Sequence, residues 1–281
     1  MKFTTKIYRE IKVFVLLMCG LATLLPAHND LEQSILLLSQ EIETHPDSTE
    51  LYLRRGELYT HHEQYKKAIR DFKTCKRKGN KTAPLYLALA KCYHEQNKNY
   101  KALDKLDELL NKNPKQIQAL RMKGNILMDQ KEYDKAARAL ELVLQLAKEP
   151  LVENYLEAAE AYSECKEKST QEIAFRTLEK GIDDLGPLLL FYENMKGMAM
   201  RNQDYLSAIK YQTEIINHSI RKEKPYYVRA LLYNSLREKG EALKDLITAQ
   251  KMLKKLPPRF QKTKAMKELK QQIKTLKLEI E

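Results

Sequence analysis

The chain has 281 residues, of which 43% are hydrophobic and 31% are charged, a balance that favours a folded protein over a disordered one. Its 8 glycines and 9 prolines are too few for the frequent turns of a many-stranded sheet, so long helices are expected instead. The net charge of +12 would suit a nucleic-acid-binding protein only if the basic residues followed one surface.

Residues 1–27 have the order of a secretory signal peptide. A basic leader precedes 13 uncharged residues, and Pro26-Ala27 offers a cleavage point before His28. The uncharged stretch is shorter than the ~20 apolar residues of a membrane-spanning helix. We therefore predict that the protein is exported, to the periplasm or outside the cell, and that residues 1–27 are removed. Retention as an N-terminal membrane anchor and a lipoprotein acylated at Cys19 are the alternatives.

Residues 28–48 are predicted to form a leading half-repeat. Its helix extends to Thr44, just before Pro46, and Asn29 or Asp30 is placed to cap its start. The helix is in phase with the second helix of the repeats that follow it. We therefore expect it to cover the open end of those repeats.

Aromatic and small residues recur every 34 residues, at positions 4, 8, 11, 20, 24 and 27 of a repeat that starts at residue 49. Helical spacing places the first three positions on one face of a first helix and the last three on one face of a second. Gly56 and Ala68, at positions 8 and 20, are expected to touch, because only small side chains let the two antiparallel backbones approach closely. In the first three repeats these positions hold Tyr52, Gly56, Tyr59, Ala68, Phe72 and Cys75, then Tyr86, Ala90, Tyr93, Ala102, Leu106 and Leu109, then Leu120, Gly124, Leu127, Ala136, Leu140 and Val143. One helix pair cannot bury both of its faces, so the repeats must stack.

Three further repeats are less regular. The fourth fits if its turn, around residues 166–170, is about three residues longer, with Gly181 and Gly186 as helix-stop signals. The fifth places Gly197 at position 8 and has a turn one residue shorter, whereas the sixth returns to the 34-residue register. The predicted repeats span residues 49–82, 83–116, 117–150, 151–187, 188–222 and 223–258.

The repeating pattern resembles the tetratricopeptide-repeat (TPR) family over nearly all of residues 30–258. The resemblance implies an all-α fold, a right-handed superhelical solenoid of about six antiparallel helix pairs with capping helices. Residues 54–58 and 256–259 are also similar to a group of exported bacterial TPR proteins of undefined role. Members of the family usually bind other proteins, and a protein partner is therefore expected for this chain.

The resemblance also implies where the partner binds, because positions 2, 5, 9, 12 and 13 of the first helices line a concave groove in this family. The groove residues predicted in this way are Glu57, His61, Lys91, His94, Arg121, Asn125, Asp129, Glu160, Asn194, Arg201 and Asn234. Their mixture of charges and amides suits an extended segment or a helix of a partner protein. We therefore predict an exported scaffold that docks a partner polypeptide in this groove.

Residues 259–281 are predicted to form a basic, amphipathic capping helix, with apolar residues at helical spacing from Met266 to Ile280. Residues 251–281 carry ten Lys or Arg and three Glu, a surplus of +7, and the signal segment carries a further +3. The remaining residues, 28–250, are therefore left near +2. Because the positive charge lies at the ends and not along the groove, no nucleic-acid partner is expected.

No catalytic motif is recognisable, since the chain lacks GxSxG, GxGxxG and HExxH patterns and a P-loop. We therefore expect no enzymatic activity and no cofactor. His61 and His94 fall on adjacent first helices, near Glu57 and Glu95. The alternative function is a periplasmic metal- or small-molecule-binding factor that uses these histidines.

Three cysteines remain after the signal segment, Cys75, Cys92 and Cys165. Their odd number and the lack of a CxxC pattern argue against a disulfide framework or a structural zinc site. Cys75 and Cys92 fall where the repeat requires a small residue, so we expect buried thiols. A Cys75–Cys92 disulfide is the alternative.

Overall fold

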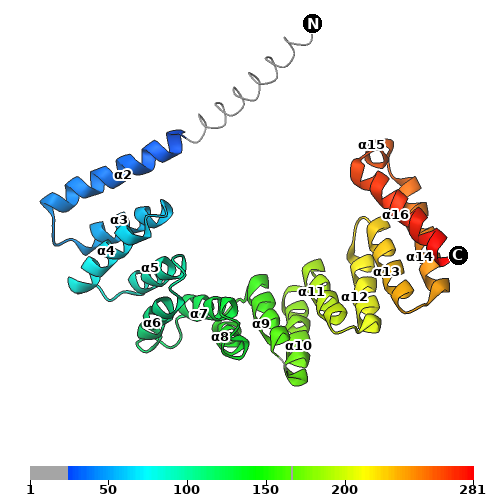
Figure 1. Cartoon of the computed structure of the whole chain (residues 1–281). Coiled ribbons are helices and arrows are strands. Elements are labelled where there is room, and N and C mark those ends of the chain that lie inside the picture. Colours follow the sequence, from blue (N-terminus) through cyan, green and yellow to red (C-terminus); the bar gives the residue numbers. More distant parts are fainter. Residues whose placement is uncertain (1–24, 166) are drawn as a thin grey trace, which may run out of the picture. The chain divides into compact units, whose positions relative to one another are not determined.

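The structure is a computed structural model that describes residues 25–165 and 167–281. These residues form fifteen helices and no strand (Figure 1), which confirms the all-α fold class. Within these two ranges, no helix is both long and apolar enough to span a bilayer. The helices are α2 (Leu25–Thr44), α3 (Thr49–His61), α4 (Tyr65–Arg77), α5 (Ala83–His94), α6 (Asn99–Leu110), α7 (Ile117–Asp129), α8 (Tyr133–Leu146), α9 (Val152–Glu164), α10 (Lys168–Leu185), α11 (Leu189–Arg201), α12 (Tyr205–His218), α13 (Glu223–Ser235), α14 (Lys239–Lys255), α15 (Pro258–Gln261) and α16 (Lys264–Ile280).

Two compact parts divide the chain, and their boundary lies within α7, between Ile126 and Leu127. In the N-terminal part α2 packs on α3, and the pairs α3–α4 and α5–α6 stack through α4 and α5. In the C-terminal part the pairs are α9–α10, α11–α12 and α13–α14, and α8 packs on α9. Within each part, a helix therefore packs mainly on its neighbours in sequence, as stacked repeats do.

The leading helix, α2, starts earlier than the sequence predicts. Its described part runs from Leu25, so Asn29 and Asp30 lie inside the helix and the predicted N-cap is wrong. The predicted signal segment lies outside the described residues except for residues 25–27, and its cleavage stays a prediction.

Five turns within the described ranges close their helix pairs in the same way. In each, one residue has a left-handed backbone, with φ between 56° and 61°, and the next residue donates its N–H to a carbonyl five residues earlier. This hydrogen bond defines the Schellman helix end. In the first repeat Gln64 N donates to Tyr59 O at 2.8 Å. The left-handed residues are Glu63, Asn97, Lys131, Gln203 and Arg237, all of them exposed.

The recurrence of this turn corrects the register of the fifth repeat. Three residues separate the end of α11 at Arg201 from the start of α12 at Tyr205, as between α3 and α4, so the predicted shorter turn is wrong. Counting back from Gln203 places Lys196, and not Gly197, at position 8. No neighbouring atom lies within 4 Å of the place where a Cβ of Gly197 would stand. This glycine therefore makes no close contact between helices.

The extra residues of the fourth repeat lengthen its second helix and not its turn. The turn between Glu164 and Lys168 keeps the usual length, so the predicted longer turn is wrong. Helix α10 has 18 residues, against 12 to 14 in α4, α6, α8 and α12. Gly181 is buried inside α10, where an added Cβ would come 2.8 Å from Phe191, so it serves close packing and does not stop the helix. Gly186, with φ of 88°, follows the end of α10 as predicted.

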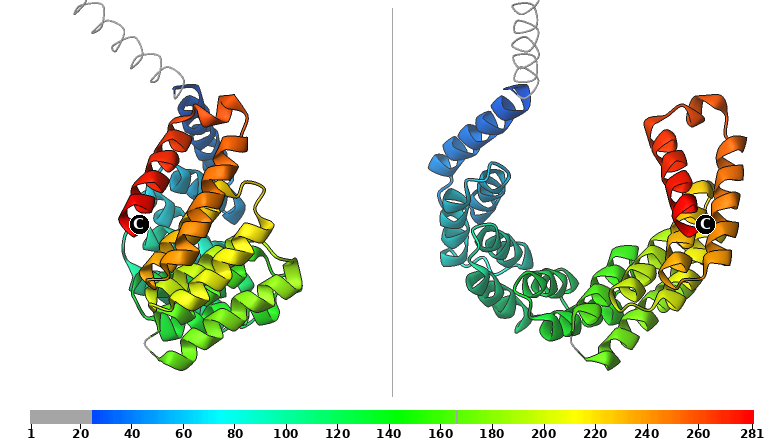
Figure 2. Two further views of the ribbon diagram at one scale, coloured as in Figure 1. Left: turned by 90° about the vertical axis from the view of Figure 1, so that its right-hand side faces the viewer. Right: turned by 45° about the vertical axis from the view of Figure 1, so that its right-hand side comes forward.

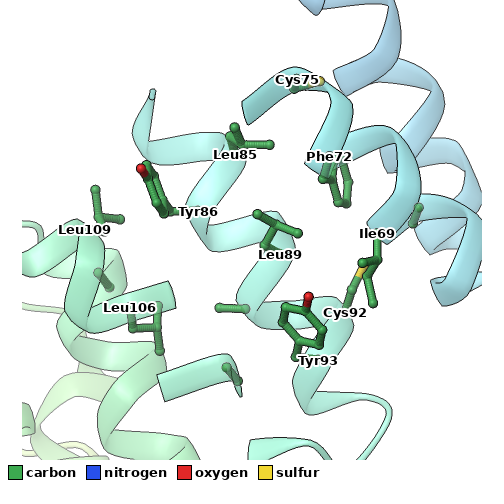
Figure 3. Close-up of a cluster of buried hydrophobic side chains, with 14 of the residues drawn as sticks. Ile69, Phe72, Cys75, Leu85, Tyr86, Leu89, Cys92, Tyr93, Leu106 and Leu109 are labelled. Atoms are coloured by element: carbon green, nitrogen blue, oxygen red, sulfur yellow. The ribbon is translucent and has the colours of Figure 1, made fainter. Parts of the chain in front are cut away.

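The core of the N-terminal part forms between consecutive helix pairs. Figure 3 shows Leu89 of α5 between Phe72 of α4 and Leu106 of α6, and all three side chains are buried. A Cβ added to Gly56 would come within 2.4 Å of the Phe72 ring. The side chain nearest to Gly56 is therefore the aromatic ring at position 24, which the predicted contact between Gly56 and Ala68 does not include.

A buried ion pair that joins three helices is found in each of the two parts. Arg55 of α3 donates two hydrogen bonds of 2.8 Å to Asp71 of α4 and one of 3.0 Å to Ser39 of α2. The second set consists of Arg229, which donates at 2.7 and 2.9 Å to Asp245 and at 2.9 Å to Thr213. Both aspartate side chains are only 7% exposed. In each of these two arginine clamps, the arginine at position 7 ties its own second helix to the helix that precedes the pair.

All three cysteines of the described ranges are buried and free. Cys75 and Cys92 are fully buried, which confirms their expected role as small core residues. The Cys75 thiol donates to the Thr49 carbonyl at 3.2 Å, and the Cys92 sulfur lies 3.2 Å from the Thr60 hydroxyl. The alternative disulfide is not formed in this structure. Burial raises the pKa of the Cys75 thiol to about 11, which keeps it protonated at neutral pH.

Glu108 connects three helices of the N-terminal part. Its carboxylate accepts hydrogen bonds from Lys76 of α4 at 2.7 Å, from Tyr86 of α5 at 3.0 Å and from Lys105 of its own helix at 3.2 Å. Burial raises the pKa of Glu108, but the hydrogen bonds from Lys76, Tyr86 and Lys105 outweigh burial and lower the pKa to about 2.

This lowered pKa predicts an acid-dependent loss of stability. The stabilisation that the ionised Glu108 carboxylate provides is present above the unfolded-state pKa of roughly 4.3 and is lost as the pH falls towards 2. Glu108→Gln should lower the free energy of unfolding at pH 7 by on the order of 1–2 kcal/mol, allowing for solvent screening. Between pH 5 and pH 2, the variant should then lose less stability than the wild type. Denaturant titrations at several pH values measure this, with exposed Glu153→Gln as the control, and equal pH slopes for wild type and Glu108→Gln would contradict it.

The C-terminal end of the chain is covered by α16, which runs beside α14 (Figure 2, red and orange). The apolar stripe predicted for this helix is buried, through Leu269, Ile273, Leu276 and Ile280. The capping helix is shorter than the predicted 259–281, because Pro258–Gln261 forms the separate helix α15. Proline suits the first turn of a helix, so Pro258 starts a new helix there.

Candidate partner-binding surface

The first helices of neighbouring repeats contact each other directly within each part, α3 with α5 and α9 with α11. Three of the predicted groove residues lie exposed on the first of these pairs, Glu57 and His61 on α3 and Lys91 on α5. The structure therefore places these three side chains on an accessible surface of adjacent first helices.

A cleft of about 370 Å³, the α2–α3 cleft, lies beside Glu57 and His61. Its lining includes Leu37 and Leu38 from α2 and Arg54, Glu57, Leu58 and His61 from α3. The leucines supply an apolar contact area, and the charged side chains supply hydrogen-bonding groups of both signs. Such a combination can bind an amphipathic polypeptide segment.

The contribution of α2 to this cleft is missing from the sequence prediction, which places only Glu57 and His61 there. Leu36 and Leu37 of α2 are 58% and 53% exposed. The signal that could have identified α2 is the apolar run of residues 35–38, because a helix packed on one side cannot bury four consecutive apolar residues.

His94, the other predicted histidine, is half-buried at the end of α5. Its Nδ1 lies 3.0 Å from Oδ1 of Asn99 at the start of α6, so one ring nitrogen takes part in a contact that joins the two helices. Within the described ranges, no group of three or more His, Cys, Asp and Glu residues is arranged to hold a metal ion.

Three predicted groove residues lie on α7, where the two parts of the chain meet. Arg121 is half-buried, whereas Asn125 and Asp129 are exposed. Arg121 and Asn125 belong to the N-terminal part, and Asp129 belongs to the C-terminal part. Arg121 and Asn125 therefore lie in the same part of the chain as the α2–α3 cleft, and Asp129 lies in the other part.

The remaining groove residues belong to the C-terminal part. Glu160 and Arg201 are exposed, and Arg201 Nη2 donates to Ser163 Oγ at 3.2 Å, which connects α11 to α9. Asn194 donates at 2.9 Å to a carbonyl of its own helix, and the corrected register moves it to position 6, outside the predicted groove positions. Asn234 is half-buried on α13.

Comparison with known proteins identifies the fold class of this helix arrangement. No protein-family model and no curated protein matches the sequence. A solved structure of the C-terminal part of a TPR repeat-containing protein from Cytophaga hutchinsonii is similar, with a TM-score of 0.65 and 15% identity over 89% of this chain and 98% of that chain. A TPR protein from Parabacteroides merdae has a TM-score of 0.55 and 18% identity over 88% of this chain and 94% of that chain. YrrB, described as a TPR protein with an unusual peptide-binding site, has a TM-score of 0.53 and 12% identity over 64% of this chain and 91% of that chain.

The chain is thus an all-α helical-repeat solenoid, built from consecutive helix pairs. Its fold is that of the solved TPR proteins, which confirms at the level of the fold the resemblance seen in the sequence.

Proposed function

We propose that the protein is a non-catalytic scaffold that binds a segment of a partner polypeptide in the α2–α3 cleft, between the leading helix and the first helix of the first repeat. The observation that carries this proposal is the composition of the cleft, an apolar area with charged groups of both signs beside it. Leu37 is about half exposed there, and covering a leucine side chain with a partner contributes roughly 1–2 kcal/mol to binding. The peptide-binding site ascribed to YrrB, a protein of the same fold, supports a polypeptide as the ligand.

Site-specific photo-crosslinking in the native host tests this proposal. A photoreactive benzoylphenylalanine in place of exposed His61, inside the cleft, should produce a crosslinked partner that mass spectrometry identifies. The same residue in place of Lys73, exposed on α4, should not produce that partner. Leu37→Lys should reduce the His61 crosslink at least about tenfold, because it places a charge in the apolar area.

Leu206→Lys is the matched control, since Leu206 is 72% exposed on α12 in the other part of the chain. This variant should leave the crosslink unchanged. Identical adducts from positions 61 and 73, or a crosslink that survives Leu37→Lys, would show that the partner does not occupy the cleft.

We also propose that the protein acts outside the cytoplasm, on the basis of the signal-like residues 1–27. Mass spectrometry of the protein from extracytoplasmic fractions is expected to find an N-terminus at His28. A chain that keeps Met1 in the membrane fraction would favour the anchor, and a chain that keeps Met1 in the cytoplasmic fraction would contradict export.

A further inference from the structure

A second and larger cleft, the turn cleft, lies in the N-terminal part between the turn that joins α3 to α4 and the turn that joins α5 to α6. Its volume is about 630 Å³, and its lining comes from residues 63–67 and 96–98. None of these residues belongs to the α2–α3 cleft or to the predicted groove. Both turns are Schellman turns, and their left-handed residues Glu63 and Asn97 line the cleft. Backbone hydrogen bonds therefore hold both walls in place.

Gln64 and Gln96 both line this cleft, and each has one buried side-chain atom without a hydrogen-bond partner among the described residues, Oε1 of Gln64 and Nε2 of Gln96. Gln96 uses its other amide atom, Oε1, to accept a hydrogen bond of 2.6 Å from Lys98 Nζ, so only its NH₂ group is left over. Buried polar groups of folded proteins are nearly always paired. An unpaired acceptor and an unpaired donor in one cleft are therefore suited to a ligand that carries both complementary groups.

A backbone peptide group is such a ligand, because it offers one N–H donor and one C=O acceptor. An extended chain presents these groups without internal hydrogen bonds. The charge of the lining also restricts the kind of peptide, since Lys66, Lys67 and Lys98 outnumber the one carboxylate, Glu63. This positive balance favours an acidic segment. The half-buried ring of Tyr65 adds an apolar wall against which an extended segment can lie.

We propose that the turn cleft binds an extended acidic peptide segment of another protein. On binding, the Gln64 and Gln96 side chains rotate to expose their buried amide atoms, and one peptide group of the segment donates its N–H to Gln64 Oε1 and accepts a hydrogen bond from Gln96 Nε2. The site is independent of the α2–α3 cleft, because the two clefts share no residue.

Titration by NMR tests this proposal with a defined probe, the capped tripeptide acetyl-Asp-Ala-Asp-N-methylamide. Saturable shifts are expected for the Gln96 side-chain amide and for the backbone amides of Tyr65 and Asn97, at millimolar peptide. Gln96→Leu and Gln64→Met should each weaken binding about 3–10-fold, the effect of one lost hydrogen bond. Gln130→Leu is the matched control, because Gln130 is exposed and has the same place in the turn between α7 and α8 as Gln96 has in its own turn. This variant should bind with unchanged affinity.

Two further measurements distinguish peptide binding from simple anion binding. An analogue of the peptide with ester linkages in place of its peptide N–H groups should bind at least about 3-fold more weakly. Equal binding of this analogue, or equal shifts with free glutamate or inorganic phosphate, would reduce the cleft to a simple anion site and overturn the proposal. An absence of saturable shifts would overturn it as well. Leu37→Lys should leave the titration unchanged, so failure here and failure of the α2–α3 cleft are distinguishable.

Discussion

Asp71→Ala is expected to lower the free energy of unfolding by about 3 kcal/mol or more. The reason is the arginine clamp, in which Arg55 is 17% exposed and holds Asp71 through two hydrogen bonds of 2.8 Å. Without the carboxylate, Arg55 would keep its charge in a mostly buried position with only the Ser39 hydroxyl as a remaining partner in the clamp. Loss of a buried partner costs far more than loss of an exposed one.

Denaturant unfolding measures this loss, and hydrogen exchange in α3 and α4 localises it, because stacked repeats need not unfold in one step. Asp47→Ala is the matched control, since the Asp47 side chain is 96% exposed although it pairs with Lys78 at 2.6 Å. This control should change stability little. The double replacement of Arg55 by Met and Asp71 by Leu should restore most of the loss, because it leaves no buried charge. A loss for Asp71→Ala no larger than that for Asp47→Ala would show that the clamp is not a stabilising unit.

Gly56→Ala should be the second large effect, a loss of about 1–3 kcal/mol from a single added methyl group. The new Cβ would lie 2.4 Å from the buried Phe72 ring, which cannot move without disturbing the core between α4 and α5. Gly197→Ala should have the opposite sign, a gain of about 0.5–1 kcal/mol, because alanine is the better helix former and no atom lies within 4 Å of the new methyl group.

Thermal and denaturant unfolding of the two variants check this pair of expectations. Phe72→Leu in the Gly56→Ala background should recover part of the loss, since the smaller side chain leaves room for the methyl group. Effects of equal sign and size for Gly56→Ala and Gly197→Ala would contradict the corrected register of the fifth repeat.

The sequence predicts the fold well where spacing alone determines it. Small residues at 12-residue separation within a 34-residue period, such as Gly56 with Ala68, are sufficient to identify the helix pairs of the first three repeats. The fifth repeat is misread because a glycine lies one position after the close-contact site, which holds Lys196. The fourth is misread because extra residues can extend a helix as readily as a turn, and the spacing of core residues is the same in both cases.

The candidate sites are less predictable, because they depend on contacts between helices that the repeat pattern does not contain. The α2–α3 cleft requires the exposed face of α2, which lies outside the repeating motif. The turn cleft requires two turns 34 residues apart to face one space, and nothing in the residues of either turn predicts the other. Arg55 and Asp71 are 16 residues apart in the sequence and pair between α3 and α4, so their ion pair can be recognised only from the structure.

The left-handed turn residues have a consequence for how such a chain can diverge. Left-handed backbone costs residues other than glycine roughly 1–2 kcal/mol each, yet Glu63, Asn97, Lys131, Gln203 and Arg237 all adopt it at exposed positions. Stability can therefore change at the turn edge by exchange of single surface residues, without any change to the core or to the first-helix surface. In the first two repeats this freedom is linked to binding, because Glu63 and Asn97 also line the turn cleft. A glycine in place of Asn97 would relax the backbone but remove a polar side chain from the cleft, so selection for a bound peptide and selection for stability would oppose each other there. A glycine in place of Glu63 would relax the backbone and also remove the one carboxylate of the lining, so the two selections would act in the same direction.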